Sequence, residues 1–333
     1  MNAIAIAPHQ PAIQAVLDLY AKTDLVPVAR ATAALHVLLH DLYREPDAAI
    51  AWQTSTLTGD GFPLEFAVTS SDADLRYTTE ISTPLVAPVQ RLALAQQRLR
   101  QLTPAEIPAA VLARLQQVQQ GGELRYGTWV GGRHGLRGDS YKLYVEVPAA
   151  DLATFHTPLA ECQIPYPTLA DRPVRLRMLG YNLTSRRLEA YFRVPQVESY
   201  HVPRLMQLCG AGDRASELWD FIEASYGYSL RGKLPGGSVG FSYSVAPDGL
   251  SPIFTLFLFA RALWGGDARI RRQFSALAAQ QGWDITPYHQ LTQPLALRHT
   301  WATDHGLLGV GVAATGSIAL SLGIRPGGTG DAG

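Results

Sequence analysis

The chain has 333 residues, 47% hydrophobic and 17% charged, a composition that excludes an intrinsically disordered or fibrous protein. Its 28 Lys and Arg residues balance 28 Asp and Glu residues, so no overall positive charge favours binding to nucleic acid or to an anionic membrane. Cys162 and Cys209 match no metal-ligand spacing and no disulfide framework, and no segment has the ~18 uninterrupted apolar residues of a membrane span, so we expect a cytoplasmic protein.

Alternating apolar and polar residues predict five β-hairpins along the chain. The predicted strand pairs are 62–70 with 75–81, 124–130 with 141–147, 174–181 with 186–194, 238–245 with 253–259, and 307–313 with 317–324. Helical periodicity predicts helices around these hairpins, at 11–42, 89–102, 104–120, 149–156, 202–226 and 267–281. In the second hairpin, the glycine-rich segment 131–139 is predicted to be the turn.

The repeated order of helices and hairpins predicts an α+β fold with an antiparallel sheet, because the turns are too short for parallel crossovers. Closing ten strands into a barrel removes the sheet edges and places the helices outside. A barrel of this size has a lumen that side chains do not fill, so we expect a central cavity. Residues 1–325 form one predicted domain, followed by a disordered tail at 326–333.

The polar set of each predicted strand faces the lumen, since the apolar set packs on the helices. Four cations are predicted inside, with tyrosines two residues away on two of the strands, and unpaired buried charges are too costly to be structural filler. The inward-facing set includes Glu65, Arg76, Lys142, Tyr144, Arg187, Glu189, Tyr191 and Arg193.

Clustered cations favour a polyanion such as a diphosphate, and neighbouring aromatic rings stabilise a carbocation by cation–π attraction. The carboxylate of Glu65 can orient an acidic N–H or O–H group. An alternative for Glu65 is an ion pair with Arg76 across the first hairpin. The combination describes the ionisation of an allylic diphosphate followed by attack from an electron-rich aromatic ring.

Three segments resemble the ABBA-type aromatic prenyltransferases, in particular the bacterial members of the dimethylallyltryptophan synthase group. They are Leu57 to Ile81, Trp129 to Pro148, and Arg186 to Val194. The resemblance implies a barrel of five αββα repeats, a Glu65 that holds the indole N–H, and no requirement for a metal, Mg²⁺ or another cofactor. It also implies a diphosphate site made by Arg76, Lys142, Tyr144, Arg187 and Tyr191, to which we add Arg193 on the same strand face.

The sequence departs from the fungal members of this group at several predicted lumen positions. Glu189 stands where they have a lysine, Phe257 replaces a tyrosine, and Gly323 replaces another tyrosine, which predicts a wider donor end that accepts geranyl diphosphate. We assign Trp129, Thr255, Phe257 and Gly323 to the pocket for the prenyl group and the acceptor, and Arg175 is either solvated or holds a substrate carboxylate.

The predicted function is transfer of a dimethylallyl or longer group from its diphosphate to the indole ring of tryptophan or an indole derivative, by electrophilic aromatic substitution. One alternative keeps the donor and changes the acceptor to a phenol, a naphthalene or a peptide. Another is a barrel that carries an apolar ligand without chemistry. We expect small-molecule substrates and no nucleic-acid or membrane partner.

Overall fold

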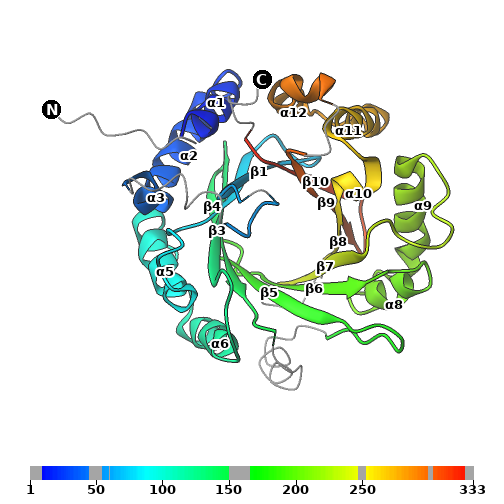
Figure 1. The fold of residues 1–333 in the computed structure, drawn as a ribbon, viewed down its shortest axis with the longest axis horizontal. Helices are drawn as coiled ribbons and strands as arrows, with labels where there is room; N and C mark the ends of the chain where they lie inside the picture. Colours follow the sequence, from blue (N-terminus) through cyan, green and yellow to red (C-terminus); the bar gives the residue numbers. More distant parts are fainter. Residues whose placement is uncertain are drawn as a thin grey trace.

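The computed structural model describes residues 10–44, 55–59, 61–149, 166–246, 253–298 and 303–326. Ten antiparallel strands close into a barrel in which each strand pairs with its neighbours in sequence and β1 pairs with β10, as predicted (Figure 1). The strands are β1 (Leu64–Thr69), β2 (Leu75–Thr79), β3 (Thr128–Gly135), β4 (Gly138–Glu146), β5 (Arg175–Asn182), β6 (Leu188–Pro195), β7 (Ser238–Val245), β8 (Ile253–Phe259), β9 (His305–Ala313) and β10 (Ala319–Ile324).

Helices surround the barrel on its outside (Figure 1). They are α1 (Gln10–Ala21), α2 (Leu25–Leu38), α3 (His40–Arg44), α5 (Arg91–Leu102), α6 (Ala109–Gln119), α8 (His201–Gln207), α9 (Ala215–Tyr226), α10 (Ala260–Trp264), α11 (Asp267–Gln281) and α12 (Thr286–Leu291). None of the helices in the described ranges is long and apolar enough to cross a membrane. Residues 150–156 of one predicted helix, residues 327–333 of the predicted tail, and Cys162 lie outside the described residues.

Two predicted helices are each divided in the structure. The segment 11–42 is interrupted where Asp24 accepts a hydrogen bond from the backbone N–H of Val26 and so caps the start of α2. The segment 202–226 is divided at Gly210, whose φ of 69° suits the residue after a helix end.

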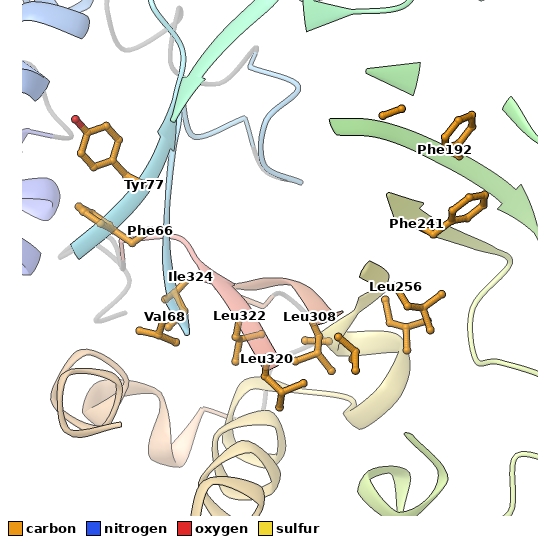
Figure 2. Close-up of a cluster of buried hydrophobic side chains, with 14 of the residues drawn as sticks. Phe66, Val68, Tyr77, Phe192, Phe241, Leu256, Leu308, Leu320, Leu322 and Ile324 are labelled. Atoms are coloured by element: carbon orange, nitrogen blue, oxygen red, sulfur yellow. The ribbon is translucent and has the colours of Figure 1, made fainter. Parts of the chain in front are cut away.

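The outer face of the barrel wall forms the hydrophobic core with the helices. On β1, Leu64, Phe66 and Val68 are buried, whereas the intervening residues retain some exposure. Figure 2 shows Phe66 and Val68 beside side chains of β10, including Leu322, on the side of the wall that carries the helices. The alternation therefore assigned the outer and inner faces of this strand correctly.

The second hairpin differs from its prediction, because the glycine-rich segment belongs to β3 and the turn is only Leu136 and Arg137. Aromatic rings cover two of these glycines. A Cβ atom at Gly132 would lie 2.8 Å from Cε2 of Tyr77, and one at Gly131 would lie 3.0 Å from Cε2 of Tyr144. Glycine is used here for close approach of a ring to the strand, and the turn signal was wrong.

The barrel has two distinct ends. All five hairpins turn at one end, which we call the hairpin end, and the chain passes to its helices at the other, which we call the helix end. Odd-numbered strands therefore begin at the helix end, and even-numbered strands begin at the hairpin end. This polarity decides which predicted site residues can act together.

Candidate active site in the barrel lumen

Lys142 is the centre of a hydrogen-bonded network in the lumen. Its ammonium group donates to a carboxylate oxygen of Glu189 and, over 2.7 Å, to the hydroxyl of Tyr191. The other oxygen of Glu189 accepts a 2.6 Å hydrogen bond from the Ser242 hydroxyl. Burial alone would lower the pKa of Lys142, but the Glu189 carboxylate raises it, so the lysine is charged.

The lumen around this network is accessible to solvent. The side chains of Lys142 and Glu189 retain 20% and 15% of their exposed surface, whereas Leu143, on the outer face of β4, is fully buried. Residues that point inward in a closed barrel can retain exposure only if the lumen is not filled by side chains. The inward face is therefore available to a ligand.

Aromatic rings line the lumen beside Lys142. Its ammonium nitrogen lies 5.0 Å from the ring centroid of Tyr144 and 5.2 Å from that of Tyr191, within the range of a cation–π interaction. The ring of Phe257 is 5.7 Å from that of Tyr191, and Thr255 lies opposite Ser242 on the neighbouring strand. This arrangement joins a cation to an aromatic wall.

Arg76 lies toward the hairpin end of the barrel, because it is the second residue of β2, which begins there. Its guanidinium donates to Asp72 over 2.6 Å, and Asp72 also accepts from Arg133. The predicted alternative pair between Glu65 and Arg76 is therefore not formed. Arg76 is close enough to Lys142 for its charge to oppose protonation of the lysine. Arg187 comes directly before β6, at the same end.

Glu65 lies nearer the helix end and, among the described residues, has no hydrogen-bond or ion-pair partner. Burial raises the pKa of Glu65 to about 7, because nothing in its surroundings offsets the loss of solvation. Its carboxylate lies over Gly323, where an added Cβ atom would be 2.8 Å from Oε2 of Glu65. Gly323 faces the lumen as expected, and the Glu65 carboxylate occupies the space beside it. The wider donor end and the acceptance of geranyl diphosphate stay predictions.

Arg193 does not join Lys142. Lys142 lies opposite Asn182 on β5, whereas Arg193 lies opposite Arg175, seven residues earlier on that strand. At ~3.3 Å per residue this separates the two levels by roughly 20 Å. Arg193 is exposed and donates to Ser238. The structure therefore places Arg193 and Arg175 together at the helix end, the end toward which Glu65 lies. This position of Arg193 contradicts its assignment to the diphosphate cluster.

Trp129 is held at the helix end by two contacts. Its indole N–H donates to Glu80 over 2.9 Å, and its ring stacks on Tyr126 with centroids 3.8 Å apart. Across the strand pair it faces Tyr144. Trp129 therefore continues the aromatic wall from Tyr144 toward Glu65's end of the barrel.

Two polar residues complete the lumen network beyond the predicted site list. Glu189 was placed inside by alternation, but its contact with Lys142 depends on strands that are not neighbours in the sheet. Ser242 belongs to the SVGFSYSV stretch, whose serines alternate with apolar residues and so carry a signal for the inward face.

No model of a known protein family matches the chain, and no curated protein is significantly similar to it in sequence. Solved structures are similar in fold. The 6-dimethylallyltryptophan synthase from Micromonospora olivasterospora, in complex with DMASPP and Trp, is 16% identical with a TM-score of 0.77, covering 97% of this chain and 98% of that one.

The 5-dimethylallyltryptophan synthase from Streptomyces coelicolor, also in complex with DMASPP and Trp, is 15% identical with a TM-score of 0.74, over 92% of this chain and 90% of that one. AnaPT from Neosartorya fischeri is 14% identical with a TM-score of 0.67, over 95% and 92% of the two chains. The chain therefore has the closed ten-stranded barrel fold of the ABBA-type prenyltransferases.

Proposed function

We propose that this protein is an aromatic prenyltransferase that moves a dimethylallyl group from its diphosphate to the indole ring of tryptophan or an indole derivative. The observation that carries the proposal is the joining of a charged Lys142 to the aromatic wall of Tyr144, Tyr191 and Phe257 inside the barrel. The substrates named for the solved structures of the same fold, DMASPP and Trp, support it.

The polarity of the barrel suggests how two substrates are arranged. The donor diphosphate would meet Arg76, Lys142 and Arg187 in the middle of the lumen and toward the hairpin end. The acceptor would lie toward the helix end, where the Glu65 carboxylate can accept a hydrogen bond from the indole N–H. A carboxylate on the acceptor would then find Arg175 and Arg193 at the rim.

In this reaction the C–O bond of the allylic diphosphate breaks and the electron pair leaves with the diphosphate. The cations stabilise the charge that develops on the leaving group, and the aromatic rings stabilise the allylic cation. The indole ring supplies the electrons of the new bond, and a proton then leaves the ring to restore its aromaticity. A Glu65 carboxylate at the indole N–H makes the ring a stronger nucleophile.

The test is incubation of the protein with tryptophan and dimethylallyl diphosphate, with product analysis by mass spectrometry. We expect a product heavier than tryptophan by one dimethylallyl group in place of a hydrogen. Indole derivatives, a naphthol and a tryptophan-containing peptide tested in parallel identify the acceptor class. Binding of diphosphate without any product from these acceptors would contradict the proposal.

A further inference from the structure

A glycine on β5 allows Lys142 and Glu189 to meet. Lys142 is on β4 and Glu189 on β6, so β5 lies between them. On β5, Gly180 is opposite Glu189, and Lys142 is opposite Asn182, two residues farther along the strand. A Cβ atom at Gly180 would lie 2.7 Å from Cε of Lys142 and 3.2 Å from Cε2 of Tyr191. The lysine therefore crosses β5 through space that any other residue would occupy.

The carboxylate of Glu189 is fixed as well as close. One oxygen accepts from Lys142 and the other accepts from Ser242 on β7 over 2.6 Å. Asp72, the partner of Arg76, differs because it lies on the β1–β2 turn, is 24% exposed and is shared with Arg133. A turn carboxylate near solvent is screened and can move aside, whereas Glu189 is held on a strand inside the lumen.

We infer that Glu189 is a built-in counter-ion of Lys142 that sets the affinity of the lumen for the anionic part of the donor and product. This inference rests on the proposed function. With Glu189 in place, the charge of Lys142 is compensated while the lumen is empty, which avoids the cost of an isolated charge. An anion that approaches Lys142 must also approach Glu189, and the two negative groups repel each other strongly in a low-dielectric cavity.

This repulsion distinguishes donor from product. Breaking the C–O bond converts a prenyl diphosphate into free diphosphate, which has one more ionisable oxygen and no apolar tail. Glu189 therefore opposes the product more than the donor, and selects ligands whose apolar group adds to the binding. In this view Glu189 is a positioning residue for Lys142 that also favours release of diphosphate.

The experiment measures dissociation constants by calorimetry for two ligands: inorganic diphosphate and the unreactive thiolo analogue of dimethylallyl diphosphate. The main variant is Glu189→Gln, which keeps the shape and the Ser242 hydrogen bond and removes the charge. We expect it to bind diphosphate about tenfold more tightly or better, equivalent to ~1.4 kcal/mol, with a smaller gain for the thiolo analogue. Glu189→Asp keeps the charge and should show neither gain.

Two controls separate charge from structure. Glu217→Gln removes an exposed carboxylate that pairs with Arg214 outside the barrel, and should leave both constants unchanged. In a Lys142→Ala background, Glu189→Gln should also be measured. Its gain in diphosphate affinity there should differ by more than roughly threefold from its gain in the wild-type background, since the two residues act as a pair. Thermal unfolding of each variant reports whether its fold is retained.

The outcomes also distinguish this inference from the proposed function. If wild type binds diphosphate and folded Glu189→Gln binds it equally or more weakly, the counter-ion role is wrong while the prenyltransferase proposal stands. Should neither protein bind either ligand, both are wrong. An equal gain for the two ligands overturns the discrimination between donor and product.

Discussion

The carboxylate of Glu65 on β1 occupies the space that a side chain at Gly323 on the neighbouring strand β10 would need, although the residue directly opposite Gly323 is Ala67. An added Cβ atom would be 2.5 Å from Cδ of Glu65 and 2.8 Å from its Oε2. Gly306, on β9, borders the same carboxylate, with an added Cβ 3.2 Å from Cδ. The two glycines therefore form the recess in which the predicted acceptor-binding carboxylate sits.

Enlarging Gly323 should consequently disturb Glu65, whichever donor is used. We expect Gly323→Ala and Gly323→Tyr to lower transfer from dimethylallyl and geranyl diphosphate alike, because the side chain displaces the carboxylate. Steady-state rates with both donors check this. Loss of geranyl transfer alone would instead place Gly323 in the prenyl pocket, as the sequence suggested.

Neutralising Glu65 should impair the chemical step. Glu65→Gln keeps the size of the side chain, but its amide is a weaker acceptor for the indole N–H, and loss of a positioned polar group typically costs ~10²–10⁴-fold in kcat. The measurement is kcat with tryptophan, together with thermal unfolding to show that the variant is folded. A folded variant with wild-type kcat is incompatible with the assigned role.

The same substitution should change how stability depends on pH. Burial raises the pKa of Glu65 from its ordinary value of 4.5 to about 7, so over this interval the unfolded chain has lost a proton that the folded protein keeps. The cost of ionising the buried Glu65 therefore lowers the stability of the folded protein increasingly as the pH rises. We expect the Tm of Glu65→Gln to rise relative to that of wild type between pH 4.5 and about 7. Above about pH 7 the difference between the two Tm values should stay constant. A constant difference would mean that Glu65 is well solvated.

Lys142 and Arg193 form a matched pair of tests for the donor site. Lys142→Ala removes the central cation and leaves Glu189 unpaired, so donor binding should weaken by ~2–5 kcal/mol. Arg193→Ala acts on an exposed residue roughly 20 Å away along the strands and should change the donor constant by less than about twofold. Its effect should fall on the KM for tryptophan. Equal loss of donor affinity in both variants would restore Arg193 to the diphosphate site.

Activity should persist in the presence of EDTA. We propose that Arg76, Lys142 and Arg187 meet the charge of the leaving diphosphate, a task that preorganised donors can perform without a metal ion. Within the described ranges no cluster of three or more His, Cys, Asp or Glu residues is suited to hold a metal. The assay compares turnover with EDTA and with added magnesium. Activity that is lost in EDTA and restored by magnesium would mean that a metal ion bound to the donor, and not the three cations, meets the charge of the leaving diphosphate.

Alternation along each strand, together with the short turns and the need to remove sheet edges, was sufficient to predict the closed barrel and most of its inner face. On β1 the buried Leu64 and Phe66 alternate with the inward Glu65, and on β4 the buried Leu143 separates Lys142 from Tyr144. These assignments succeed because the direction of a side chain on a strand repeats every two residues, a property that neighbours in sequence decide.

The partners of the inward residues depended on tertiary structure. Lys142 meets Glu189 only because β5 presents Gly180 between their strands, and Arg193 is separated from Lys142 only because the register of β4, β5 and β6 sets their levels in the barrel. On β3, Gly131 and Gly132 leave room for the rings of Tyr144 and Tyr77, which come from the neighbouring strands β4 and β2. Each of these relationships joins residues that are distant in sequence, and strand register, which alternation alone does not specify, determines which of them meet.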